Sequence, residues 1–199
     1  MQYYCIECLI KYSINIPLKD KVQGSNPCGG TKLLNLDKMN EFFQDKLNGN
    51  NCYGCGAWNE KGLNIKSFWE GDEAICVFHP QRYHAAMPPD VLNGGTIATL
   101  IDCHCVCSSI ADAYKTENRE IGETPLIWYA TGSLKIDFKK PTPLDGPVTI
   151  RAKILNKKPK TTLFQARLFS YQNELTCEGE VLSVRVPNNW ANPHGFFSK

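Results

Sequence analysis

The sequence predicts an α+β fold in which an antiparallel β-sheet wraps around one long central α-helix. Two observations lead to this prediction. Residues 94–114 form a run of helical length whose apolar side chains lie on all sides, which is typical of a buried helix. From residue 126 onward, alternating apolar and polar segments follow one another with short turns between them. Such strands pair antiparallel with one wet face, and their dry face needs the buried helix as a cover.

The central helix is expected to span about Gly94 to Tyr114. Asn93 precedes it and suits the N-cap position, because its side-chain oxygen can accept from the free amides of the first turn. Asp102 stands in the middle of the apolar run. A carboxylate without a partner is costly there. Three explanations are open for Asp102: a hydrogen bond from another segment, exposure to solvent at the rim of the buried surface, or a catalytic role for which burial tunes its acidity.

The remaining elements follow from apolar patterns and turn residues. A short helix is predicted over 37–47, and an irregular loop over 81–91 leads into the central helix. Strands are predicted over 62–69, 73–79, 126–138, 147–155, 161–171 and 174–186. Residues 70–72 form a hairpin turn between the first two strands, and the long third strand is expected to bend at Gly132.

Composition indicates an ordinary globular protein. The chain has 199 residues, 42% of them hydrophobic and 21% charged. We expect one domain over 37–187, with an appendage or linker over 1–36 and a tail over 188–199. A net charge of +2 does not favour nucleic acid. The apolar runs are interrupted by charge or glycine and Glu7 is unlike a signal peptide, so we expect no membrane contact and a cytoplasmic location.

Ten cysteines are many for this length. Five of them lie within apolar helix or strand patterns, where cysteine acts as a small hydrophobic residue: Cys76, Cys103, Cys105, Cys107 and Cys177. Four have Cys-x-x-Cys spacing, Cys5 with Cys8 and Cys52 with Cys55. Two such pairs can hold zinc, but 43 residues separate them, well beyond the usual ribbon spacing. Free thiols are favoured, with neither metal nor cofactor.

Three motifs in order resemble a known family. They are CYGCGAWNEKGLNIK from Cys52, LNGGTIATLID from Leu92 and FKKPTPLDGPVTIRAKI from Phe138. With the final strand, they resemble the hotdog-fold thioesterases of the phenylacetic-acid-degradation (PaaI-like) type, over about Met39 to Pro187. The resemblance implies hydrolysis of an acyl-coenzyme A thioester by a homodimer or a dimer of dimers.

The same resemblance assigns roles to residues of the central helix. It makes Asp102 the acid and makes the Gly94 amide the group that holds the thioester carbonyl. Two features depart from the family pattern: Asn93 stands where the family usually has His, and the preceding loop reads YHAAMPPD. These departures concern substrate and rate more than fold.

The chemistry agrees with these roles. Thioester hydrolysis places negative charge on the carbonyl oxygen, and free amides at a helix N-terminus stabilise such charge. Gly94 and Gly95 expose those amides, although glycines here can also serve close packing. Asp102 would act as general base on water or as a nucleophile that forms a mixed anhydride. For Asn93, capping is favoured over contact with the substrate.

For each of the other candidate site residues, a purely structural role is an alternative to a functional one. Ser109 lies two turns beyond Asp102 and can orient water, but a capped hydroxyl is favoured. His104 is expected to be a packed core residue. His84 either lines the mouth of the pocket or lies on the surface. Basic residues at Lys139, Lys140 and in the turn 157–160 can meet coenzyme A phosphates or remain solvated.

Two further functions stay open from the sequence. One is a non-catalytic protein that binds or senses acyl thioesters, which the replacement of the family's His by Asn93 favours. The other is a dehydratase, which needs a His beside the acid. Gly94 and Asp102 are eight positions apart, or about 12 Å along a helix. One helix therefore cannot supply both groups to one carbonyl. If both residues are catalytic, an antiparallel second helix must supply the acid.

Overall fold

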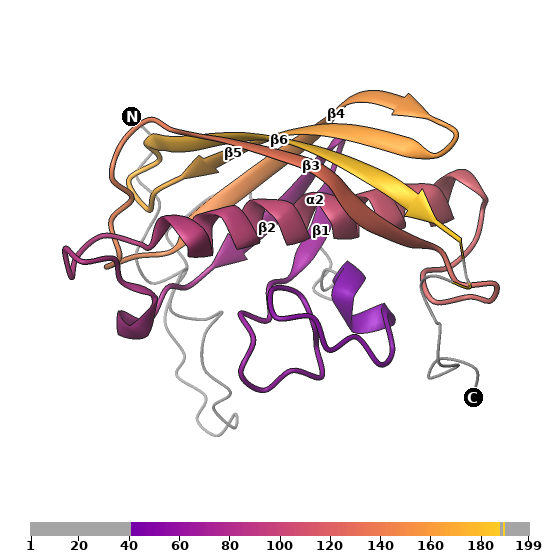
Figure 1. Cartoon of the computed structure of the whole chain (residues 1–199), viewed down its shortest axis with the longest axis horizontal. Coiled ribbons are helices and arrows are strands. Elements are labelled where there is room, and N and C mark those ends of the chain that lie inside the picture. Colours follow the sequence, from indigo (N-terminus) through magenta and orange to yellow (C-terminus); the bar gives the residue numbers. More distant parts are fainter. Residues whose placement is uncertain (1–40, 188, 190–199) are drawn as a thin grey trace, which may run out of the picture. The chain divides into compact units, whose positions relative to one another are not determined.

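The computed structural model describes residues 41–187 and 189, so the predicted appendage over 1–36 and nearly all of the tail lie outside the described residues. The described part holds one α-helix, six strands and two short 3-10 turns (Figure 1). In chain order these are η1 (Phe43–Lys46), β1 (Ser67–Glu70), β2 (Glu73–Phe78), η2 (Arg82–His84), α2 (Gly94–Thr116), β3 (Trp128–Phe138), β4 (Val148–Lys158), β5 (Thr161–Phe169) and β6 (Leu175–Val186).

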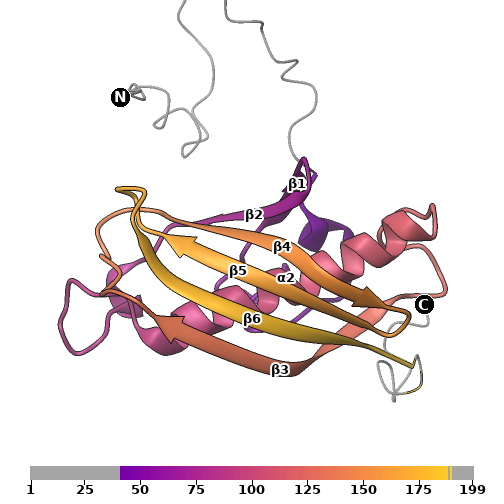
Figure 2. The same ribbon diagram turned by 90° about the horizontal axis from the view of Figure 1, so that it is seen from above.

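The six strands form one antiparallel sheet in the order β1-β2-β4-β5-β6-β3. Figure 2 shows α2 crossing one face of this sheet, with β3 as the outer strand on one side and β1 on the other. Along β5 buried and half-buried residues alternate, as expected for a sheet with one face on the core. The predicted α+β architecture is therefore confirmed.

The central helix is two residues longer than predicted and begins at the predicted Gly94. Its core positions include Leu100, Ile101 and Cys105, each with no exposed surface. The sheet approaches so closely that a Cβ added at Gly179 would lie 2.9 Å from Ile101 Cγ2. By length and composition α2 could cross a membrane, but 67% of its apolar window is buried inside the fold. Packing against the sheet accounts for its apolar character.

The first predicted strand, over 62–69, is too long, because β1 occupies only its second half. The preceding residues bond to an upstream loop instead of extending the sheet. The Leu63 amide donates to the Tyr53 carbonyl at 2.8 Å, and the Ile65 amide donates to the Gly54 carbonyl at 3.1 Å. Both apolar side chains are buried. The backbone partners of these two residues therefore lie in the Cys-x-x-Cys loop and not in the sheet.

Two other predictions have mixed outcomes. The register of β3 against β6 shifts at Gly132, between Thr131 and Ser133, so the predicted irregularity is present as a bulge. The predicted helix over 37–47 is wrong in its described part, which holds only the 3-10 turn η1. Residues 37–40 lie outside the described residues. The side chain of Gln44 in this turn bonds to Ser67 of β1, and that tertiary contact favours a single turn over a longer helix.

Candidate active site

The N-terminus of α2 offers one free backbone amide. Asn93 caps the helix, since its Oδ1 accepts from the amides of Gly95 at 2.8 Å and Thr96 at 3.2 Å. The predicted capping role is confirmed. The Gly95 amide is thereby occupied, which corrects its predicted role as a second donor to substrate. The Gly94 amide makes no hydrogen bond to the described residues, so it remains able to bind an anionic oxygen at the positive end of the helix dipole.

Phe138, the last residue of β3, lies close to Gly94. A Cβ added at Gly94 would stand 3.2 Å from the ring carbon Cζ of Phe138. The ring is 57% exposed, so it borders the free amide without being locked in the core. The sequence motif around Phe138 indicated a turn and did not reveal that its ring covers the helix N-terminus. This contact arises because β3 runs antiparallel to α2, and the sequence does not indicate how the two elements lie against each other.

His84 positions the loop that leads into α2. Its carbonyl accepts from the Asn93 amide at 2.9 Å, and its Nδ1 accepts from the Gln81 amide at 2.9 Å. The ring is buried beside Phe78 and Tyr83, and this burial lowers its pKa. His84 therefore acts on the N-cap through the backbone. The alternative of a simple surface histidine is wrong.

Asp102 is half-buried on the side of α2 that faces β3. Thr131 Oγ1 donates a hydrogen bond of 2.7 Å to its Oδ1, which is the link from another segment that the sequence called for. Burial raises the pKa of the Asp102 carboxyl, and the Thr131 hydrogen bond partly opposes the shift because it favours the charged form. A half-buried carboxyl with a raised pKa suits general-base or nucleophilic chemistry.

Ser109 and His104 do not join Asp102. The Ser109 hydroxyl is fully buried and donates to the Cys105 carbonyl at 3.0 Å, so it is the capped hydroxyl and its predicted contact with substrate is not supported. His104 is also fully buried, with Nδ1 2.8 Å from Ser67 Oγ and Nε2 3.1 Å from the Ala74 carbonyl. Its burial lowers its pKa to about 4. The predicted core role of His104 is confirmed.

The basic residues lie at opposite ends of α2. Lys139 and Lys140 directly follow Phe138 and so lie near the helix N-terminus, where they pair with Glu178 (3.2 Å) and Glu174. These four charged side chains are between 31% and 55% exposed, and ion pairs open to solvent are weak.

The second basic segment lies at the other end of the helix. Lys157 pairs with Asp112 and donates to Thr116 Oγ1 at 2.6 Å, both in the last turns of α2. A hollow of about 300 Å³ lies there between α2 and the β4–β5 turn. Another, of about 420 Å³, lies beside η2 and is lined by Arg82 and Asp90 among others. Neither of these two hollows is lined by Gly94 or Asp102.

A second group of side chains was not predicted from the sequence. Cys52, Cys55 and Cys103 bring their sulfur atoms within 4.8 Å of one another. The sequence placed the first two in a motif and the third in the apolar helix, without a link between them. Their meeting depends on how the loop packs on α2.

Comparisons with known proteins agree with this fold. Residues 90–177 match the family model of the thioesterase superfamily, and no curated protein gives a significant sequence match. A thioesterase structure from Haemophilus influenzae is 16% identical, with a TM-score of 0.54, over 67% of this chain and 86% of that chain.

Two further solved structures are similar at the same level. A putative thioesterase from Lactococcus lactis is 17% identical, with a TM-score of 0.50, over 61% of this chain and 81% of that chain. The PaaI protein from the phenylacetic acid degradation operon of E. coli is 13% identical, with a TM-score of 0.50, over 63% of this chain and 81% of that chain. At these identities the likeness shows the fold alone.

The described domain therefore has the hotdog fold, with one long helix packed against a six-stranded antiparallel sheet. The match of residues 90–177 to the thioesterase superfamily model supports the resemblance to hotdog thioesterases. It supports a thioester hydrolase in general terms.

Proposed function

We propose that this protein is an acyl-coenzyme A thioesterase, with the Gly94 amide as oxyanion donor and Asp102 as the acid–base or nucleophilic group. One observation carries the proposal: the free Gly94 amide begins the same helix that holds a half-buried Asp102. The first group suits a developing negative charge. The second can accept a proton, since it is held by a hydrogen bond and not by a cation.

Two routes are consistent with this pair. In the first, Asp102 takes a proton from water, and the resulting hydroxide attacks the thioester carbon. In the second, the carboxylate attacks the carbon itself and forms a mixed anhydride, which water then opens. In both routes negative charge gathers on the carbonyl oxygen beside Gly94. Collapse of the intermediate breaks the carbon–sulfur bond, and the thiolate leaves and takes up a proton.

The site requires two chains. Eight helical positions separate Gly94 from Asp102, about 12 Å along the axis, so a carbonyl bound at one end cannot reach the acid of its own helix. An antiparallel second α2 would bring a partner acid to each amide, giving two shared sites in a homodimer. The outer edge of β3 pairs with no described strand, and Leu134 and Phe138 on this strand are exposed. This unpaired edge and its exposed apolar side chains support β3 as the surface that contacts the second chain.

Coenzyme A is the proposed acyl carrier because the basic pair Lys139–Lys140 follows Phe138 near the oxyanion donor. Displacing the weak exposed pairs with Glu178 and Glu174 would free both ammonium groups for phosphates. The acyl chain would then extend from the Gly94 amide toward the partner's helix.

A non-catalytic acyl-thioester binder is the second candidate, and one observation favours it. Asn93 caps the helix and occupies the Gly95 amide, which leaves a single backbone donor and no proton shuttle at the helix N-terminus. Release of coenzyme A from a panel of acyl esters, followed as free thiol, distinguishes the two. Turnover supports the hydrolase, whereas saturable binding without thiol release supports the binder. Loss of water from a β-hydroxyacyl ester would indicate a dehydratase instead.

A further inference from the structure

A cluster of thiols joins the loop before β1 to the middle of α2. Cys52 and Cys55 come from the sequence Cys-Tyr-Gly-Cys-Gly, and Cys103 and Cys107 lie one turn apart on the helix. The sulfurs of the first three residues are within 4.8 Å of one another. Cys107 is not one of these three, but it lies one helical turn beyond Cys103, and its interaction with Cys55 together with burial raises the pKa of its thiol. Cysteine pairs with two and three intervening residues, from two separate segments, are the usual supply of ligands for structural zinc.

The distance between two of these sulfurs fits metal coordination. Cys52 Sγ and Cys103 Sγ are 3.7 Å apart. Zinc–sulfur bonds of about 2.3 Å at tetrahedral angles place neighbouring sulfurs about 3.8 Å apart. A disulfide needs about 2.05 Å, and the cysteines are free thiols in this structure.

The loop backbone is shaped around the helix. The Gly56 amide donates to the Cys52 carbonyl at 2.9 Å and closes a tight turn. Gly54 lies so close to the helix that an added Cβ would stand 2.4 Å from Cys103 Sγ and 2.9 Å from Thr99 Cγ2. Only glycine permits this approach without a shift, so the turn presents Cys52 and Cys55 directly to the cysteines of α2.

Polar groups also surround the cluster. The Asn50 Nδ2 amide donates to Cys55 Sγ at 3.5 Å, and the fully buried Gln44 side chain acts to lower the pKa of the Cys107 thiol, against the effect of its burial. Amide donors of this kind stabilise thiolate ligands and orient them. Cys52 alone is exposed, which leaves a path by which an ion can enter.

We infer that Cys52, Cys55, Cys103 and Cys107 form a structural Zn²⁺ site that fastens the Cys-x-x-Cys loop to α2. Four thiolates fill the coordination sphere, so the ion has no open position for substrate. The site fixes the helix turn that carries Asp102, the residue before Cys103. This inference is independent of the proposed hydrolase activity and replaces the expectation of free thiols.

The test measures zinc in the full chain, purified under reducing conditions without chelator. About one Zn²⁺ per chain is expected. After a chelator has removed the zinc, cobalt added to the protein should give the intense visible absorption bands of tetrahedral thiolate coordination. Because Cys5 and Cys8 share the Cys-x-x-Cys spacing, the double variant Cys5→Ala/Cys8→Ala is measured in parallel and should keep its zinc.

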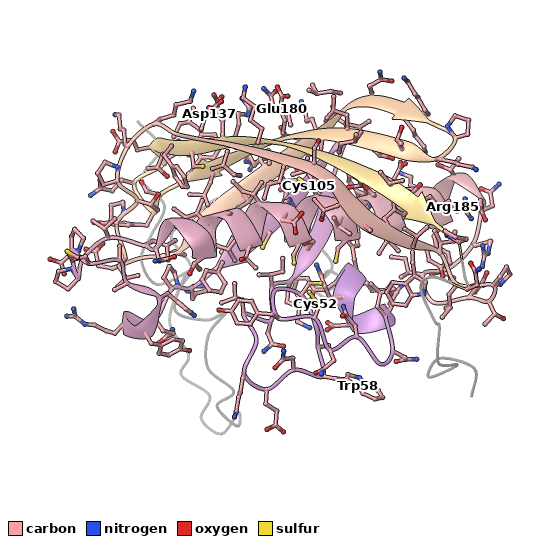
Figure 3. The ribbon with its side chains drawn as sticks, viewed as in Figure 1. Cys52, Trp58, Cys105, Asp137, Glu180 and Arg185 are labelled. Carbon is pink, nitrogen blue, oxygen red and sulfur yellow. The ribbon has the colours of Figure 1, made fainter. Side chains whose placement is uncertain are left out.

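Two variants of one helix provide the matched comparison. Cys103→Ala should lose the bound zinc, while Cys105→Ala should retain it. Figure 3 shows Cys105 on the sheet side of α2 and Cys52 on the opposite side. If Cys103→Ala fails to fold, alkylation of the cysteines in the wild-type chain, mapped by mass spectrometry, provides a second test. In the unmodified chain, Cys52 and Cys55 should be protected until a chelator is added.

Three results would overturn the inference. The wild-type chain could bind neither zinc nor cobalt after supplementation. The metal could be lost with Cys5 and Cys8 and not with Cys103. Intact-mass analysis of freshly isolated, metal-free protein could show a Cys52–Cys103 disulfide, which would make the cluster a redox pair instead.

Discussion

Thr131 of β3 donates a 2.7 Å hydrogen bond to Asp102 of α2. This bond ties the candidate acid to the outer strand of the sheet, at the bulge where β3 shifts its register against β6. Burial raises the pKa of Asp102 while the bond lowers it. The reactivity of the acid therefore depends on a residue 29 positions away.

Removing the charge tests whether Asp102 acts in hydrolysis. Asp102→Asn should lower kcat by about a hundredfold to ten-thousandfold, the usual contribution of a general base. The free energy of unfolding at neutral pH should stay equal or rise. Because the folded pKa of Asp102 is raised, ionisation of this group costs stability as pH climbs through that range, and Asn removes that cost. Thermal melts at pH 4 and pH 7 check the sign. Undiminished hydrolysis would exclude Asp102 from the mechanism.

The Thr131 bond should be visible in the pH profile. Thr131→Val removes a donor that favours the carboxylate, so the pKa of Asp102 should rise further. Hydrolysis needs the ionised form, and the acidic limb of kcat should therefore move to higher pH. Thr131→Ser keeps the hydroxyl and is the control, with a limb close to wild type. A Val variant with an unmoved limb and reduced kcat would mean that Thr131 serves only packing.

The role of Asn93 is tested by two residues that both cap well. Asn93→Ser and Asn93→Asp should preserve the helix, since each retains an oxygen for the amides of Gly95 and Thr96. If the Asn93 amide also donates to the thioester carbonyl, Asp should be at least about tenfold slower than Ser, because it places negative charge against the oxyanion. Equal kcat/KM values would limit Asn93 to capping.

Phe138 and Gly94 should be coupled. Gly94→Ala introduces a Cβ 3.2 Å from the Phe138 ring, so the ring must shift by a few tenths of an ångström, and the added methyl group crowds the oxyanion site. Activity should fall while the melting temperature changes little, since the exposed ring is free to move. Phe138→Ala in the Gly94→Ala background should restore part of kcat/KM. A double-mutant cycle measures this coupling, and strictly additive losses would show that the ring does not shape the site.

Mixed dimers test whether two chains share each site. Gly94→Trp and Asp102→Asn should each be inactive alone. When they are co-assembled through two different affinity tags, one site collects both lesions and the other collects neither, so about half of the wild-type rate should return. Verified mixed dimers as inactive as their parents would rule out the shared-site arrangement. A rate that did not depend on mixing would place the acid and the amide in one chain.

The sequence by itself determined the architecture and the start of the central helix. An apolar run of helical length after a good N-cap residue leaves few alternatives, and alternating strands with short turns specify an antiparallel sheet. The periods of helix and strand are local properties, and burial of the apolar faces selects one way to combine them. For the same reason Asp102 stood out, because a charge in a buried helix breaks a local rule.

Only the tertiary structure decided which groups meet. The Thr131 bond to Asp102, the Phe138 ring over Gly94 and the meeting of Cys52 with Cys103 join segments that are distant in the chain. The shortened first strand has the same origin, because Leu63 and Ile65 bond to the Cys-x-x-Cys loop. Sequence periodicity records which side of an element is buried, but not which distant residue lies against it. Packing alone settles that, and in this protein it settles the environment of the acid and brings the sulfurs of Cys52, Cys55 and Cys103 together.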